Sequence, residues 1–359
     1  MDFSLSQEQE LLQETVRGLV TRECPASRVR QVFDGESGVD DVLWSSLAQM
    51  GVCGLLVPER HGGAGLGMLE LALVSEELGR GAAPTPLFGH SLASLGILLG
   101  GSAAQQAAWL PPLAAAEKRV GLALGEPDGA WRPECWTPAL EGTHLSGVKD
   151  FVLDAPQADV LLVGCAGGRL ALVDTGSVGV EIELANSLDR GRRHARVRFE
   201  KARAEPLAEE ASPAERLLDA GCILLAAEAY GAASQLVRMS AAYANAREQF
   251  GQPISQFQGI KHQLANMALA VEPSRGLWWF AGHVFEHAPE EAPRAAALAK
   301  AHITECATQV ARDATEIHGG IGMTWECDVQ IWFKRILFAR HFLGTPEAHR
   351  ARVALLGAW

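Results

Sequence analysis

Several features are scarce in this sequence, and each scarcity excludes a class of protein. The seven cysteines are scattered, odd in number and form no Cys-x-x-Cys pair, which argues against a disulfide scaffold or a zinc ribbon and suits a reducing compartment. Positive charge is also scarce, and the formal net charge is -12. That balance disfavours nucleic acid or an anionic membrane as a partner, although a nucleotide-like ligand needs only a local cationic pocket.

Targeting signals are missing as well. The first residues, Met1-Asp-Phe-Ser-Leu-Ser6, have no basic stretch followed by an apolar core, so we expect no signal peptide. No apolar run approaches the length of a membrane-spanning helix, which needs about 20 residues. These absences predict a soluble, cytoplasmic protein.

The chain has room for two or three domains, because it has 359 residues and 48% of them are hydrophobic. Residues 1–118 predict a mostly helical domain. Ser6 and Gln9 match a capping box, and further helices are expected from Asp40 or Asp41 to Met50 and over residues 68–78.

Residues 119–205 predict a β domain. Its segments are short, alternate or are rich in β-branched residues, and are separated by Gly, Pro, Asp and Asn, which is typical of a small barrel or sandwich. The expected strands cover residues 120–124, 149–153, 160–163, 170–173, 178–183 and 195–199.

Residues 206–359 predict an up-down bundle of four helices. Ser212-Pro-Ala-Glu215 supplies an N-cap serine, a first-turn proline and a capping-box glutamate. Gly231 in this first helix leaves room for another helix to approach closely. The second helix is expected to begin near Phe257. The third and fourth are expected over about 293–318 and 329–342.

A short turn joins the first two of these helices. Arg247 is expected in the last turn of the first helix, where a cation suits the negative end of the helix dipole. The same guanidinium fork is suited to a phosphate, which it can hold by two parallel hydrogen bonds. Gly319 and Gly320 follow the third helix, where glycine commonly caps a helix end. Residue patterns alone leave both structural and binding roles open.

The amino-acid sequences of these two stretches closely resemble those of one protein family. Arg247-x-x-Phe-Gly-x-Pro-Ile-x-x-Phe-Gln-x-Ile-Lys-His262 is similar to the flavin-contacting turn of the acyl-CoA dehydrogenases, and Ile317-His-Gly-Gly-Ile-Gly322 is similar to their glycine turn. The resemblance extends over essentially the whole chain. It implies a multidomain α+β fold with an N-terminal α domain, a middle β barrel or sandwich and a C-terminal four-helix bundle. It also implies FAD as cofactor, an acyl-CoA thioester as substrate, a tetramer and an electron-transfer protein as acceptor.

The resemblance assigns cofactor-binding roles residue by residue. Arg247, Gln258 and the backbone of Gly319 and Gly320 are implied to serve an FAD held by a neighbouring subunit. The full implied set is Arg247, Gln249, Phe250, Phe257, Gln258, Glu316, Gly319, Gly320, Glu126, Phe151, Leu153 and Thr345.

Several positions depart from the family pattern. Glu316 stands where glutamine is common, and its carboxylate would repel a pyrophosphate. Gly125 and Leu153 stand where hydroxyl side chains commonly meet the flavin, while Phe151 keeps an aromatic side chain, so an apolar ring contact from Phe151 and Leu153 is expected. Leu343 occupies the usual position of the catalytic glutamate.

The alternative position of the base, on the first bundle helix, matches Gly221. Neither leucine nor glycine can accept a proton. Glu228 lies two turns beyond Gly221, about 10 Å along the helix. It is a candidate base, with a structural or salt-bridged role as the alternative.

This pattern resembles the base-lacking subunits of heteromeric acyl-CoA dehydrogenases that act on bulky substrates such as steroid side-chain derivatives. The sequence leaves three alternatives open. The first is a self-sufficient homotetramer that uses Glu228 or another base. The second is a flavin-free structural or thioester-binding subunit, and the third is a flavin oxidase or monooxygenase of the same fold.

Two further motifs carry no assignment. Gly62-Gly-Ala-Gly-Leu-Gly67 fits neither a dinucleotide-binding nor a P-loop pattern, and no strand precedes it, so a loop is expected. His283-Val-Phe-Glu-His287 matches a metalloprotease pattern. It stops at Ala288-Pro289 without a further ligand cluster, so no metal site is expected.

Overall fold

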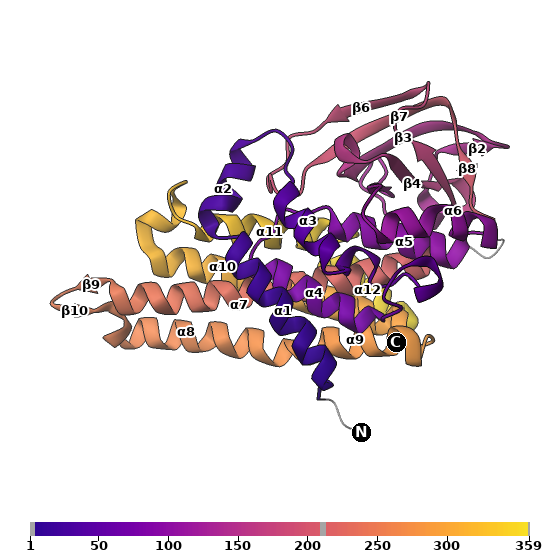
Figure 1. Ribbon diagram of the computed structural model, residues 1–359. Helices are drawn as coiled ribbons and strands as arrows, with labels where there is room; N and C mark the ends of the chain where they lie inside the picture. Colours follow the sequence, from indigo (N-terminus) through magenta and orange to yellow (C-terminus); the bar gives the residue numbers. More distant parts are fainter. Residues whose placement is uncertain (1–3, 209–212, 358–359) are drawn as a thin grey trace. The chain divides into compact units, whose positions relative to one another are not determined.

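The computed structural model describes residues 4–208 and 213–357 (Figure 1). Contacts group these residues into two compact units. The helical unit comprises the described residues of Met1–Val29, Ala72–Ala83 and Cys222–Trp359, and the sheet unit comprises those of Arg30–Leu71 and Pro84–Gly221. The expected domain boundaries at 118/119 and 205/206 rest on composition, whereas this grouping rests on contacts and joins residues 4–29 and 72–83 to the last third of the chain. The expected N-cap Ser212 lies outside the described residues.

The helical unit is built from eight α-helices. They are α1 (Gln7–Glu23), α4 (Met68–Arg80), α7 (Ala214–Ala246), α8 (Gln258–Val271), α9 (Arg275–His287), α10 (Ala292–His318), α11 (Val329–His341) and α12 (Pro346–Leu356). Helices α7 and α8 run side by side and are joined at one end by a hairpin of β9 (Glu248–Gln249) and β10 (Gln252–Pro253) (Figure 1).

Helices α4 and α7 approach each other at two glycines. A Cβ added to Gly79 would lie 2.0 Å from the carbonyl oxygen of Glu228, and one added to Gly231 would lie 1.9 Å from that of Glu76. No side chain fits at such a distance from a backbone atom. The prediction that Gly231 allows close helix approach is therefore confirmed.

Helix α7 corrects the prediction about apolar runs. In the part of the chain that the structure describes, this 33-residue helix alone is long and apolar enough to cross a membrane. Its most apolar window has a mean hydropathy of 1.3 and is 89% buried. The apolar character of α7 is explained by this burial.

The sheet unit contains four further helices. They are α2 (Ala26–Asp34), α3 (Asp41–Gln49), α5 (Leu87–Gly100) and α6 (Ala103–Ala114). The predicted start of a helix at Asp40 or Asp41 is confirmed, since α3 begins at Asp41. Asp40 caps it, because its carboxylate accepts hydrogen bonds from the amides of Val42 and Leu43. Gly51 follows the helix in a left-handed conformation.

The strands of the sheet unit form one mixed sheet with the order β6-β7-β3-β1-β4-β5-β8, and β2 pairs with β3. Only β1 and β4 pair in parallel among the described strands. The strands are β1 (Val120–Ala123), β2 (Ala139–Glu141), β3 (His144–Leu153), β4 (Val160–Cys165), β5 (Arg169–Asp174), β6 (Val180–Leu184), β7 (His194–Arg203) and β8 (Glu205–Pro206).

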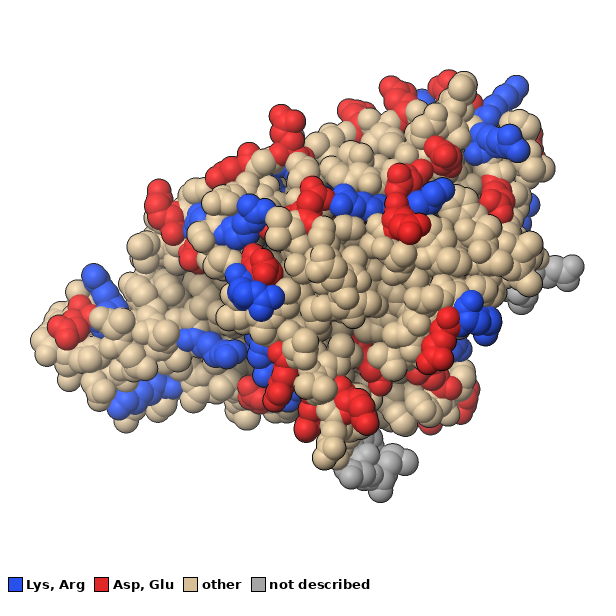
Figure 2. Space-filling view, in the orientation of Figure 1, with Lys and Arg blue, Asp and Glu red and all other residues tan. Residues whose placement is uncertain are grey.

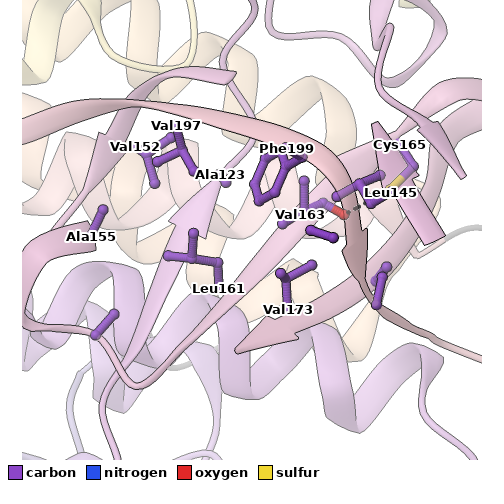
Figure 3. Packing of buried hydrophobic residues seen from close by; sticks show 14 of the residues in the cluster. Ala123, Leu145, Val152, Ala155, Leu161, Val163, Cys165, Val173, Val197 and Phe199 are labelled. Atoms are coloured by element: carbon purple, nitrogen blue, oxygen red, sulfur yellow. Dashed lines mark hydrogen bonds between the residues drawn. The ribbon is translucent and has the colours of Figure 1, made fainter. Parts of the chain in front are cut away.

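One cluster of buried apolar side chains forms the core of this sheet (Figure 3). Alternate residues contribute, such as Leu161, Val163 and Cys165 of β4, because successive side chains of a strand point to opposite faces. Val197 and Phe199 of β7 meet them from across the cluster (Figure 3). The prediction of a strand-rich middle segment is confirmed.

Some expected elements differ from the observed ones. The second bundle helix is interrupted around Pro273, which separates α8 from α9, and α12 is a helix that the sequence reading did not include. Strands β2 and β8 were also not predicted, and β3 begins at His144 rather than Lys149. Helix α7 ends at Ala246, so Arg247 lies one residue beyond it and not in its last turn.

Charged side chains of both signs are scattered over the visible face of the molecule, and no broad basic area appears there (Figure 2). This distribution agrees with the formal net charge of -12. On this face an anionic ligand would be held by a few local cations rather than by a general positive field.

Candidate functional site

The two motifs that the sequence singled out meet at one end of the helical unit. The ring of Tyr243 in α7 stacks on that of His318 in α10, with centroids 4.3 Å apart. The Tyr243 hydroxyl donates a hydrogen bond to the His318 carbonyl over 3.3 Å. These contacts place the end of α7, which precedes Arg247, beside the end of α10, which precedes Gly319.

Arg247 presents an exposed cation at this end. Its amide donates to the Tyr243 carbonyl over 2.8 Å, and its own carbonyl accepts from the Ile254 amide over 2.8 Å, so its backbone is fixed. Its side chain is exposed and takes part in none of the ion pairs found among the described residues. A guanidinium held this way is available for an anion from outside the unit.

The hairpin beyond Arg247 carries two aromatic residues. Phe250 is 93% exposed and has a φ of 55°, and its ring meets that of Phe257 edge to face at 6.0 Å. Gln249 and Gln258 are exposed next to them, Gln249 in β9 and Gln258 at the start of α8. Four of the predicted cofactor residues are thus brought together on one hairpin and its flank.

Gly319 and Gly320 offer uncovered backbone. Gly319 has a φ of 65° and follows the end of α10, and both glycines are exposed. A Cβ added to either would meet nothing within 4 Å, so no neighbouring atom of the unit crowds this turn. The carboxylate of Glu316, one turn earlier, accepts a hydrogen bond from the Gln263 amide over 3.0 Å. That contact holds the one nearby acid of the motif against α8.

The carboxylate of Glu126 is buried and bound by other residues of the sheet unit. Its carboxylate is 2% exposed, pairs with the ammonium of Lys149 at 2.5 Å and accepts from the Thr137 hydroxyl at 2.5 Å. Its amide donates to the Ala130 carbonyl over 2.9 Å. Burial lowers the pKa of Lys149 from its usual range, and the contact with Glu126 opposes that shift. These contacts indicate a structural role for the Glu126 carboxylate.

The other two predicted residues of the sheet unit differ in exposure. Phe151 is 36% exposed, whereas Leu153 is 1% exposed. Leu153 is therefore not part of the uncovered surface around Phe151, and the expected ring contact falls to Phe151 alone. Gly125 is buried, and a Cβ there would lie 2.7 Å from the Asp150 carbonyl oxygen.

The position matching the usual base lies in a rigid turn. Leu343 is 4% exposed with a φ of 58°, and Gly344 follows with a φ of 106°. Nε2 of His349 lies 2.9 Å from the Leu343 carbonyl oxygen, and Nζ of Lys300 lies 2.9 Å from that of Gly344. Thr345 then caps α12, since its hydroxyl accepts from the Ala348 amide.

Lys300 and His349 were not anticipated from the sequence. Lys300 is fully buried in α10, and burial lowers its pKa to about 8. Burial, followed by the Lys300 charge, lowers the pKa of His349 to about 3, so this imidazole is neutral near pH 7. A lysine between Ala299 and Ala301 on a buried helix face was the only local signal.

Glu228, the remaining candidate base, is paired and buried. Its carboxylate lies 2.8 Å from the guanidinium of Arg335, and the two side chains are 2% and 0% exposed. Arg335 also donates to the carbonyls of Ala82 and Ala83. A base must reach the proton it removes, and a carboxylate enclosed in this way has no open side. The contacts favour the structural alternative for Glu228.

The His283–His287 motif shows no metal-binding arrangement. The two imidazoles stack with centroids 4.3 Å apart, and both are exposed on α9. Among residues 4–208 and 213–357 no group of three or more His, Cys, Asp or Glu is placed to hold a metal ion.

The bundle end has the chemistry needed for a phosphate-bearing ligand. It combines a fixed, exposed guanidinium at Arg247 with uncrowded glycine backbone at Gly319 and Gly320. The sheet unit offers an aromatic surface at Phe151 and no hydroxyl at Gly125 or Leu153. Each unit by itself therefore offers part of what FAD requires, the helical unit by charge and backbone amides and the sheet unit by a ring contact rather than by hydroxyl groups.

Comparisons with known proteins give one consistent result. Residues 6–117 match "Acyl-CoA dehydrogenase, N-terminal domain" and residues 211–355 match "Acyl-CoA dehydrogenase, C-terminal domain". Acyl-CoA dehydrogenase IpdE2 of Mycolicibacterium smegmatis is 32% identical over 353 residues, covering 97% of this chain and 98% of that protein.

Two solved structures are similar along their whole length. One is "Tcur3481-Tcur3483 steroid ACAD G363A variant", with a TM-score of 0.91, 32% identity and 99% of both chains covered. The other is "Electron transferring flavoprotein of Acidaminococcus fermentans: Towards a mechanism of flavin-based electron bifurcation", with a TM-score of 0.90 and 26% identity, covering 99% of this chain and 98% of that one.

Proposed function

Because this chain belongs to the acyl-CoA dehydrogenase family, we propose that it serves as a subunit that lacks the catalytic glutamate and contributes part of an FAD site. The family is an FAD-dependent class of oxidoreductases that act on CH–CH bonds of acyl-CoA. The reaction is the α,β-desaturation of an acyl-CoA thioester. The base is supplied by a second chain of the same family.

The observation that carries this proposal is the absence of a base at both family positions. Leu343 lies in a buried turn with a left-handed backbone, and Gly221 is buried in α7. Glu228 is enclosed by Arg335. No side chain at these three positions can take the proton next to the thioester carbonyl.

The chain's own residues act on binding and on the geometry of the site. Arg247 offers two parallel hydrogen bonds to a phosphate, and the amides of Gly319 and Gly320 offer neutral donors beside it. Lys300 and His349 hold the turn at Leu343 closed by binding its carbonyl groups. FAD, when bound, would be the acceptor of the hydride from the β-carbon.

The substrate we propose is a bulky acyl-CoA of the steroid side-chain class, with an electron-transferring flavoprotein as acceptor. The name of the first solved structure pairs two components and describes a steroid ACAD, and that chain is 32% identical to this one. The second structure is named as an electron-transferring flavoprotein. A tetramer that includes the base-carrying chain is the assembly that suits this division of roles.

The test is an assay with an artificial electron-accepting dye. The chain alone is expected to show little or no turnover on short, long and steroid-like acyl-CoAs. Co-expression with a family member that carries the glutamate is expected to give turnover. Robust turnover by the chain alone, abolished in a Glu228→Gln variant that thermal melting shows to be folded, would establish the self-sufficient enzyme instead. A chain that stays colourless in both preparations would favour the flavin-free subunit.

A further inference from the structure

A groove in the helical unit is lined by α9, α10 and the end of α12. Three large apolar side chains line it, Phe280 of α9, Leu298 of α10 and Leu356 of α12, and they remain 39%, 41% and 48% exposed. Pro293 and Ala295 of α10 add to the apolar lining. The groove encloses about 680 Å³, part of which is open solvent. An apolar occupant of this groove would remove several large side chains from water at once.

The rim of the groove is charged. Glu290 and Glu291 from the loop before α10 line it, as does Arg294 in the first turn of α10, and all three are exposed. None of them takes part in the ion pairs found within 4–208 and 213–357. A carboxylate accepts a hydrogen bond from an N–H group, and a guanidinium packs over an aromatic face. This rim therefore suits an uncharged aromatic ring that carries one donor.

Both of these contacts occur with tryptophan elsewhere in the protein. In the sheet unit the indole nitrogen of Trp109 donates to the carboxylate of Glu205 over 3.2 Å. In the helical unit the guanidinium of Arg275 lies 4.5 Å from the centre of the Trp279 ring. An indole thus combines the apolar surface that the walls require with the donor and the ring face that the rim can bind.

The described chain stops beside this groove. Helix α12 ends at Leu356, and the amide of Gly357 donates to the Val353 carbonyl over 2.9 Å. Ala358 and Trp359 follow in the sequence and lie outside the described residues. Trp359 is three positions after Leu356, and three residues reach at most about 10 Å. A tryptophan is therefore tethered within a short distance of the groove that Leu356 lines.

We propose that the indole of Trp359 occupies this groove, so that a residue after α12 covers it within the same chain. A short tether keeps the local concentration of the indole in the millimolar range, which favours it over a free ligand of the same chemistry. The docked indole holds the end of α12. Two turns earlier the same helix carries His349, which is bound to the Leu343 carbonyl. The proposal does not depend on the proposed function.

The test is fluorine NMR of the full chain labelled with 5-fluorotryptophan. The signal that is missing from Trp359→Phe identifies residue 359 among the nine tryptophans. Its shift between H₂O and D₂O is expected to be smaller than that of free 5-fluorotryptophan, because a docked ring is shielded from water. Phe280→Ala and Leu298→Ala remove apolar surface from the groove. Each should lower the ratio of docked to free indole about five- to thirtyfold and move the isotope shift towards the free value.

Leu269→Ala is the matched control, because Leu269 is a 71% exposed leucine of α8 that does not line the groove. Its signal from residue 359 should equal that of the wild type, and thermal melting confirms that the variants fold. A wild-type signal with the full isotope shift of the free amino acid would overturn the proposal. So would a signal that is unchanged in folded Phe280→Ala and Leu298→Ala. A docked signal that appears only as protein concentration rises would also overturn it, because the indole of another copy would then fill the groove.

Discussion

Gly79 of α4 and Gly231 of α7 each lie against a backbone carbonyl of the other helix, Gly79 against Glu228 and Gly231 against Glu76. The two helices therefore touch backbone to backbone, without an intervening side chain. A methyl group added at either glycine has no flexible side chain to displace, so the helices themselves must separate.

Gly231→Ala is expected to destabilise the helical unit by about 1–3 kcal/mol or more, because overpacking outweighs the better helix propensity of alanine. Gly276→Ala on α9 is the control, since a Cβ there meets nothing within 4 Å. That change should raise stability by up to about 1 kcal/mol. Urea unfolding of both variants measures the difference, and equal midpoints would contradict the helix contact.

Arg247→Ala is expected to release FAD from the assembled enzyme. A charge-assisted hydrogen bond contributes roughly 1.5–3 kcal/mol, so flavin affinity should fall about ten- to a hundredfold. Arg247→Lys should retain part of the affinity, because a point charge lacks the planar fork. FAD stoichiometry after gel filtration is the measurement.

Arg238 is an exposed arginine within α7, and the Arg238→Ala variant should keep its full flavin content. If Arg247 only stabilises the helix end, a different result is expected for the Arg247→Ala variant. In that case Arg247→Ala would lose a little thermal stability and no flavin.

Glu228→Gln is expected to act on stability. It leaves the buried guanidinium of Arg335 without a counter-charge, which costs about 3–5 kcal/mol. Replacing both partners by apolar residues, as in Glu228→Leu with Arg335→Met, should recover much of that loss. Unfolding midpoints of the single and double variants test this. A single variant as stable as the wild type would show that the pair is not charged and buried as described.

The stability of the protein should fall with decreasing pH below about 6.5. Burial lowers the pKa of His349 to about 3 and that of His90 to about 4, each from 6.5. The unfolded chain therefore binds protons that the folded chain refuses, and the loss begins at the unfolded pKa. Between pH 6.5 and 5 each imidazole should remove roughly 2 kcal/mol.

His349→Gln should flatten this dependence, because glutamine keeps a donor for the Leu343 carbonyl and does not titrate. His262→Gln, a change at an exposed histidine of α8, should leave the slope unaltered. Thermal midpoints measured from pH 7.5 to about 4.5 give the comparison. Parallel curves for wild type and His349→Gln would show that another group controls the acid limit.

Local signals explain the elements that were predicted well. Ser6 forms the expected capping box with Gln9, and Asp40 caps α3, because these contacts join residues two or three positions apart. The loop at 62–67 and the start of α4 at Met68 follow from glycine content and periodicity in the same way. The residue types over a few consecutive positions were sufficient to predict each of these elements.

Contacts between distant residues explain what was missed. The expected roles of Glu126 and Glu228 could not include Lys149 and Arg335, since partners 23 and 107 positions away leave no local pattern. The first bundle helix was expected to include Arg247 but ends at Ala246, a difference within the usual uncertainty at helix ends. Leu343 was identified only by resemblance, and the contacts that hold its turn come from α10 and α12.

Exposed apolar side chains on the hairpin and on the turn after α10 make the stability of this protein depend on its concentration. Phe250 and Met323 are 93% and 80% exposed, so the isolated chain keeps large apolar side chains in water. Water contact is lost only when another surface covers them, and that association obeys mass action. Where a second chain covers these side chains, the melting temperature rises with protein concentration. The same protein is therefore less stable to heat in a dilute sample.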